Sequence, residues 1–272
     1  MCWSLAGKAS WSAMQDPDVL HLLILGGTAE AARLVDALHD RFGPELAVTT
    51  SLAGMTRAPR ALPGSVRVGG FGGADGLADW LRAHHVGFVI DATHPFASQM
   101  SANVREACDA VSLPRLSFVR APWTAADGDN WRNVSNLDTA AALLPDLAKR
   151  VFLSIGSARL DLFSGLRNVH LVVRMIDSPE KPLPLADYSV ILARGPFDEA
   201  AERKLLCDER IEAVVSRNSG GAATVAKIKA AKALGLPVVM ISPPVRETGE
   251  CVESLEGALK WITKRIEEAR RA

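Results

Sequence analysis

Short apolar runs rich in β-branched residues alternate along the chain with segments of helical periodicity. This alternation is typical of parallel sheets covered by helices on both faces. In the first half, the predicted strands are Leu20–Leu25, Leu46–Ser51, Val66–Val68, Val86–Asp91 and Arg115–Val119. The predicted helices between them are Thr28–Arg41, Ala74–Ala83 and Phe96–Ala110.

The pattern breaks at Trp123–Asn136, a polar, turn-rich stretch that we interpret as an inter-domain connection. It then restarts, with strands predicted at Val151–Ile155, Val169–Val173, Ser189–Leu192, Ala213–Ser216 and Val238–Ile241. Helices are predicted at Asp138–Ala148, Asp198–Cys207, Ala222–Leu234 and Leu255–Arg270. The sequence thus predicts an α/β protein with two Rossmann-like domains, mainly parallel sheets and a ligand cleft between them. We expect a disordered extension at 1–19, a first domain at 20–125 and a second at 126–272.

Composition narrows the function classes. The 272 residues carry 31 basic and 31 acidic side chains, so bulk charge does not favour nucleic acid or an anionic membrane. The four cysteines are far apart and the six histidines lack ligand spacing, so we expect no metal. No apolar run approaches the ~20 residues of a membrane span, and the N-terminus does not resemble a secretory signal. We therefore expect a cytoplasmic protein.

The first predicted strand runs straight into Gly26 and Gly27. The glycines allow a tight turn, and Thr28 is placed to cap the helix that Ala29 and Glu30 open. The free amides of such a helix start favour a phosphate group. The alternative is a strand–helix turn that simply needs glycine.

The second predicted strand ends at Thr49, Thr50 and Ser51, followed by Arg57 and Arg60. In a dinucleotide fold this position meets the adenosine ribose, where a carboxylate suits NAD and hydroxyls with arginines suit NADP. No acid follows until Asp75, so NADP is the better fit. A solvated basic loop is the alternative.

The next two loops carry further candidate residues. Four glycines surround one aromatic ring after the third strand, which lets backbone lie against a flat ligand: Gly69, Gly70, Phe71, Gly72 and Gly73. The fourth strand ends in the run Asp91, Ala92, Thr93, His94, Pro95, Phe96 and Ala97. His94 could shuttle a proton or simply cap the turn.

In the second half, three small, hydroxyl- or glycine-rich turns follow strands, at Ser154–Leu160, Ala193–Phe197 and Ser216–Thr224. In the last of these, Asn218 or Ser219 could cap the next helix and leave its amides for an anion. Five arginines lie at or near strand ends: Arg120, Arg159, Arg174, Arg194 and Arg217. Each alone is more often a surface charge, but together they suggest a substrate with several carboxylates.

The segments "ILGGTAEAARL", "SLAG", "VGGFGG", "DATHPFA", "ARGPF" and "SRNSGGAATVAKIKAAKALGLPVVMI" together resemble the precorrin-6A reductases of cobalamin (vitamin B12) biosynthesis. The resemblance runs from about Leu22 to Ile241. It implies an NADPH-dependent oxidoreductase that reduces one ring double bond of precorrin-6A to give precorrin-6B. It also implies a small-molecule substrate, a polycarboxylate tetrapyrrole, with no nucleic-acid or membrane partner.

The resemblance also assigns residues. The cofactor would be held by Gly26, Gly27, Thr28, Ala29, Glu30, Ser51, Arg57, Gly69, Gly70, Phe71, Gly72, Asp91, Ala92, Thr93 and His94. The macrocycle would be held by Pro95, Phe96, Arg120, Gly156, Ser157, Arg159, Arg194, Gly195, Ser216, Arg217, Asn218, Ser219, Gly220 and Gly221. His94 is one candidate proton donor and solvent is another. Two positions depart from the family pattern: Met55 stands where an arginine often follows "SLAG", and Arg217 stands where lysine is common.

Other functions stay in view. A short-chain dehydrogenase would need a Tyr-x-x-x-Lys pair, but the single tyrosine, Tyr188, is followed four residues later by Leu192. A redox-sensing regulator that binds NADP without turnover would use the same glycine turn, although the arginine-bearing turns favour a large anionic ligand. A reductase acting on the cobalt-containing counterpart of the substrate is a third possibility. We expect a monomer or a small homo-oligomer.

Overall fold

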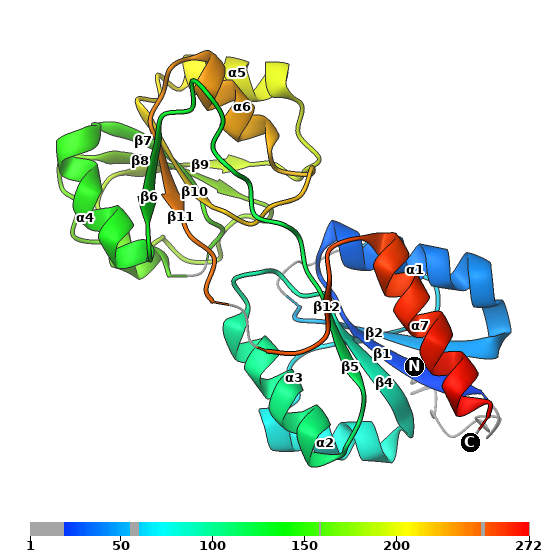
Figure 1. The fold of residues 1–272 in the computed structure, drawn as a ribbon. Coiled ribbons are helices and arrows are strands. Elements are labelled where there is room, and N and C mark those ends of the chain that lie inside the picture. The colour runs from blue at the N-terminus through cyan, green and yellow to red at the C-terminus, as the bar shows by residue number, and fades with distance from the viewer. Residues whose placement is uncertain (1–18, 55–59, 158, 246–247, 272) are drawn as a thin grey trace, which may run out of the picture.

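The computed structural model describes residues 19–54, 60–157, 159–245 and 248–271. It has two halves, each built on a six-stranded, wholly parallel sheet (Figure 1). The first sheet has the order β12 (Cys251–Val252), β5 (Arg115–Phe118), β4 (Val86–Asp91), β1 (Leu20–Leu25), β2 (Leu46–Leu52) and β3 (Ser65–Val68). The second has the order β6 (Trp131–Val134), β11 (Val238–Ile241), β10 (Ala213–Arg217), β7 (Arg150–Ser154), β8 (His170–Met175) and β9 (Tyr188–Leu192).

The two halves exchange their last strands. β6 follows β5 along the chain but pairs with β11, in the second sheet, whereas β12 follows β11 but pairs with β5, in the first. The chain therefore crosses between the halves twice, through residues 119–130 and 242–250 (Figure 1). We name these the first and second crossing segments.

This exchange corrects the expected division of the chain. The segment 251–269 belongs to the first half, not to the second, and β6 lies within the stretch predicted to be only a connection. A two-residue strand shows no apolar pattern, and a four-residue edge strand that includes Arg132 and Asn133 reads as polar loop. Tertiary pairing, rather than local pattern, makes both segments strands.

Helices cover both faces of the first sheet. On one face, Leu22 and Ile24 of β1 pack with α1 (Ala29–Phe42) and α7 (Leu255–Ala269). On the other, Leu23 and Leu25 pack with α2 (Ala74–Ala83) and α3 (Ser98–Ala110). β1 is buried on both sides and is accordingly an unbroken apolar run after His21.

The second sheet is covered in the same way. α4 (Leu137–Leu147) and the short 3₁₀ helix η2 (Leu160–Phe163) pack on one face. α5 (Glu199–Asp208) and α6 (Ala226–Ala233) pack on the other. A second 3₁₀ turn, η1 (Gly43–Glu45), links α1 to β2. α6 begins four residues later than predicted, which leaves a longer turn after β10.

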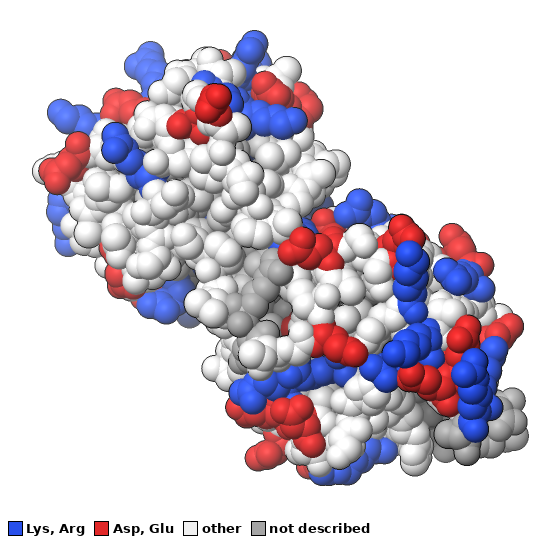
Figure 2. All heavy atoms as spheres, viewed as in Figure 1, with Lys and Arg blue, Asp and Glu red and all other residues white. Residues whose placement is uncertain are grey.

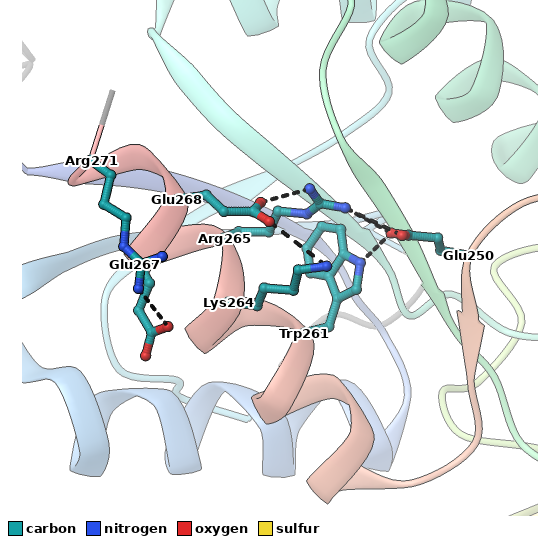
Figure 3. A network of polar contacts seen from close by, with 7 residues as sticks. All are labelled: Glu250, Trp261, Lys264, Arg265, Glu267, Glu268 and Arg271. Atoms are coloured by element: carbon teal, nitrogen blue, oxygen red, sulfur yellow. Dashed lines mark hydrogen bonds and ion pairs between the residues drawn. The ribbon is translucent and has the colours of Figure 1, made fainter.

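The second crossing segment is fastened to α7. Glu250 accepts a hydrogen bond from Nε1 of Trp261 and another, at 3.2 Å, from Nη2 of Arg265 (Figure 3). The Trp261 bond first, and Arg265 after it, hold the pKa of the Glu250 carboxyl below its ordinary value. Arg265 also pairs with Glu268 at 2.8 Å. These groups are partly exposed, so the network orients the chain end more than it stabilises the fold.

Candidate active site

The paired-glycine turn lies at the carboxyl end of the first sheet and is tied to its neighbours. The amide of Gly26 donates to the carbonyl of Ser51 at 2.9 Å, and Gly27 has a φ of +104°. Thr28 caps α1, since its Oγ1 accepts from the amide of Ala31 at 3.1 Å. The same hydroxyl donates to the carbonyl of Ala92 at 2.9 Å. The turn, β2 and the loop after β4 therefore form one rigid edge beside a helix N-terminus.

Glu30, in the first turn of α1, is 7% exposed. Its carboxylate meets Arg33 at 3.1 Å and Arg120, on the first crossing segment, at 3.4 Å. Two cations thus balance a charge that would otherwise repel a phosphate at this helix start. Glu30 contacts Arg120 rather than standing open to a ligand.

Asp91 organises the loop after β4. Its Oδ1 accepts from the amide and the hydroxyl of Thr93, at 3.1 and 2.7 Å, and its Oδ2 accepts from Ser101 at 2.6 Å. With both oxygens engaged, Asp91 fixes the backbone that presents His94.

His94 is exposed at the edge of the first cavity, although protein groups around it still desolvate the ring. This desolvation, together with the nearby charges of Arg120, Arg217 and Lys227, lowers the pKa of His94 to about 4. The ring is therefore neutral at pH 7, and its Nδ1 accepts from the amide of Phe96 at 3.3 Å. A neutral imidazole suits ligand contact better than proton donation.

The turn after β10 holds the first crossing segment. Asn218 accepts from the amide of Trp123 at 2.7 Å and donates to its carbonyl at 2.8 Å. The Trp123 indole donates to the carbonyl of Gly221 at 3.0 Å. The expected capping role of Asn218 or Ser219 is wrong, because α6 begins at Ala226 after Val225, which caps with no side chain. Asn218 is used for tertiary contact instead.

The turn also needs its glycines. A Cβ on Gly220 would lie 2.1 Å from the carbonyl oxygen of Ala121, and one on Gly221 would lie 2.7 Å from Cδ of Arg120. Only a residue without a side chain lets the second half rest so closely on the first crossing segment.

The five arginines predicted at strand ends do not all lie together in the structure. Arg120, Arg217 and Lys227 lie near enough to His94 to affect its pKa, and Arg217 lies over the Phe96 ring at 5.4 Å. Arg174 is 6% exposed, pairs with Glu202 and contacts the Phe197 ring, so it belongs to the interior. Arg159 and Arg194 lie on exposed turns. The turns that carry Gly156, Ser157 and Gly195 lie with them at the carboxyl ends of β7 and β9.

Two cavities lie where the halves meet. The first, of about 360 Å³, is lined among others by His94, Arg120, Asn218 and Pro243. The second, of about 340 Å³, is lined by Glu30, Arg33, Arg120 and Gly221 among others. Arg120 lines both cavities, and the lining residues come from both halves and from the two crossing segments.

The surface outside this region is mixed in charge. Figure 2 shows basic and acidic side chains interspersed over one face of both halves, as the zero net charge suggests. In the part of the chain that the structure describes, no three His, Cys, Asp or Glu side chains gather as metal ligands. No helix among these residues is long and apolar enough to cross a membrane.

Known proteins resemble this chain in sequence and in fold. Residues 21–263 match the family model of the precorrin-6x reductases CbiJ/CobK. The chain is 47% identical to the precorrin-6A reductase of Rhodobacter capsulatus, covering 89% of this chain and 95% of that one. It is 45% identical to the precorrin-6A reductase of Rhodococcus erythropolis, covering 89% and 96%. The chain belongs to the precorrin-6x reductase family.

A solved structure supports both the fold and the family. CobK precorrin-6A reductase superposes with a TM-score of 0.86 at 45% identity, covering 91% of this chain and 97% of that one. The two-sheet α/β fold is confirmed, and membership in the precorrin-6x reductases makes this protein an oxidoreductase acting on a carbon–carbon double bond.

Two further residues near the candidate site were not predicted from the sequence. Arg67, within β3, contacts Ser51 and the glycine loop that follows. Lys227 is 3% exposed in the first turn of α6, where it donates to the carbonyl of Thr224 at 2.9 Å. Both looked like ordinary members of a strand and a helix. Among the predicted residues, Arg57 and the N-terminal extension through residue 18 lie outside the described part of the chain.

Proposed function

We propose that this reductase uses NADPH to reduce one double bond of precorrin-6A, giving precorrin-6B in cobalamin biosynthesis. The observation that carries the proposal is the Gly26–Thr28 turn. It is a capped helix start beside Ser51, and Glu30 in the first turn of the same helix lines a cavity together with the cations Arg33 and Arg120. A dinucleotide needs the first feature, and a polycarboxylate macrocycle needs the second.

Gly26 to Glu30 would bind the pyrophosphate through backbone, with the neighbouring amides of α1 as donors. Ser51 and the loop after it would meet the adenosine phosphate. The backbone of Gly69 to Gly72 would approach the cofactor, and Asp91 to Phe96 would line its nicotinamide side. NADPH supplies the hydride when it is bound, and the protein orients the ring and limits water access.

Arg217 and the other predicted turn residues of the second half would hold the macrocycle. The Arg217 guanidinium takes part in no ion pair among the described residues, and its buried Nε has no partner there. A substrate carboxylate would satisfy it. The lowered pKa of His94 favours contact with the ligand, and it favours solvent over His94 as the source of the proton for the neighbouring carbon.

The cobalt-free substrate is favoured over its cobalt-containing counterpart. Relatives named precorrin-6A reductase are 37–47% identical to this chain, whereas those named cobalt-precorrin-6A reductase are 28–29% identical. A cytoplasmic location and a monomer or small homo-oligomer stay predictions.

The test is anaerobic turnover with NADPH and either tetrapyrrole, following loss of cofactor absorbance. Oxidation with precorrin-6A, faster than with the cobalt form, is the expected result. Calorimetry without turnover distinguishes a sensor, which would bind NADPH and ignore tetrapyrroles. Absence of NADPH oxidation with both substrates would overturn the proposal.

A further inference from the structure

Arg67, at the carboxyl end of the first sheet, is held by three hydrogen bonds. Its Nη1 donates to Oγ of Ser51 and to the carbonyl of Gly69, both at 2.9 Å. Its Nη2 donates to the carbonyl of Gly70 at 3.0 Å. Its Cζ lies 3.7 Å from the centre of the Phe71 ring, so the guanidinium is stacked as well as hydrogen-bonded. One orientation is therefore fixed before any ligand arrives.

Within the described ranges of the chain, the charge of Arg67 meets no carboxylate. Its three acceptors are a hydroxyl and two carbonyls, all neutral. No ion pair among the described residues includes it, and no acceptor there meets its Nε. Desolvation lowers the pKa of Arg67, but an arginine remains charged at neutral pH. The edge formed by Nε and Nη2 is left for a bidentate anion.

The place of Arg67 in the sheet indicates which anion it would bind. β3, β2 and β1 are adjacent, so Arg67, Ser51 and the Gly26 turn follow one another along one edge. In dinucleotide-binding sheets, the end of β2 meets the adenosine ribose. Here that end carries Thr49, Thr50 and Ser51 and no carboxylate to accept from a 2′-hydroxyl.

We propose that Arg67, with Ser51 as its companion, binds the 2′-phosphate of NADPH and so sets the preference for NADPH over NADH. The proposal rests on the proposed function and names the specificity determinant of its cofactor site. In this proposal, the Phe71 ring stacks on the guanidinium and keeps Arg67 oriented toward the phosphate, which gives the aromatic residue of the glycine loop a role in cofactor binding.

The experiment compares the wild type with Arg67→Gln, and with Arg82→Gln as control. Arg82 lies on α2 in an exposed pair with Asp79 at 2.9 Å. Binding of 2′,5′-ADP and of 5′-AMP is measured by calorimetry, and kcat and KM are measured with NADPH and NADH. Arg67→Gln should weaken 2′,5′-ADP and raise KM for NADPH by about 10- to 100-fold. Binding of 5′-AMP, KM for NADH and kcat should stay near wild type.

A second variant guards against misfolding of the loop. Ser51→Asp keeps Arg67 but places a carboxylate at the ribose position, so the NADPH to NADH preference should shift toward NADH. Equal weakening of NADPH and NADH by Arg67→Gln, or an unchanged preference in both variants, would overturn the assignment. Wild-type protein that binds neither 2′,5′-ADP nor NADPH would instead refute the proposed function itself.

Discussion

Glu30 and Arg120 form an ion pair of 3.4 Å between side chains that are 9% and 12% exposed. Glu30 opens the helix that follows the paired glycines, and Arg120 lies on the first crossing segment beside the turn at Gly221. The pair therefore joins the candidate pyrophosphate site to the candidate macrocycle site through one contact.

Replacing Glu30 with Gln should leave Arg120 nearly buried with a weaker partner. We expect the free energy of unfolding to fall by about 1–3 kcal/mol, as urea denaturation would show. Glu256→Gln is the control, because Glu256 pairs with Lys260 on the exposed face of α7 and should cost under about 0.5 kcal/mol. Equal losses in the two variants would contradict a buried pair.

Gly221 lies at a φ of +77°, directly against Arg120. Gly221→Ala should push the turn away from the first crossing segment and strain its backbone, costing about 1–3 kcal/mol of stability. It should also raise KM for the macrocycle more than KM for NADPH. Gly165→Ala, which has open space and no positive φ, should do neither. Unchanged stability and substrate affinity in Gly221→Ala would argue against this contact.

Lys227 provides a pH test. Burial, with Arg174 and Arg120 nearby and Glu202 opposing them, lowers the pKa of Lys227 to about 7 from an ordinary 10.5. Between pH 7 and 10.5 the Lys227 side chain is protonated in the unfolded chain but not in the folded protein, so the free energy of unfolding rises with pH. The destabilisation caused by burying the charged lysine is therefore largest at or below pH 7.

Lys227→Met should therefore stabilise the protein relative to wild type at pH 7, and the difference should shrink by about 2–4 kcal/mol by pH 10. Denaturant unfolding at the two pH values measures it. Lys229→Met, on an exposed position of the same helix, should show the same difference from wild type at both. A constant difference for Lys227→Met would mean that the lysine keeps its ordinary titration.

His94 should titrate near pH 4 instead of near 6.5, which proton NMR of the imidazole would follow. Removing a neighbouring cation in Arg217→Met should raise the midpoint, because protonation then meets less repulsion. Arg203→Met, on an exposed position of α5, should leave it unchanged. A wild-type midpoint near 6.5 would return His94 to consideration as a proton donor.

Several strands, one helix and one helix cap could be predicted from the local sequence. The ranges of β1, β4, β11 and α2 agree with the apolar runs, and the cap at Thr28 follows from a threonine placed between a strand and an alanine-rich helix. These features depend on residues that are near neighbours in the chain. The family resemblance, carried by short motifs in a fixed order, is confirmed by the family match over residues 21–263.

The rest depended on partners distant in sequence. β12 is a strand because β5 accepts it, and Asn218 fails to cap a helix because Trp123 engages its amide group. Arg67 is a candidate site residue because it contacts Ser51 and Phe71, which its position in a short strand does not reveal. Arg174 looked like a rim cation, but Glu202 makes it part of the core. The sequence around a buried charged residue does not reveal which distant residue will pair with it.

The exchanged edge strands mean that no single cut yields two complete halves. A fragment ending at residue 130 lacks the segment 251–269 that closes its own sheet and covers Leu22 and Ile24, while a fragment beginning there carries that segment with nothing to cover. A separable cofactor module would require joining residues 19–118 to 250–271 through an artificial linker. Loss or replacement of either half as one continuous segment would remove a strand that belongs to the sheet of the other half.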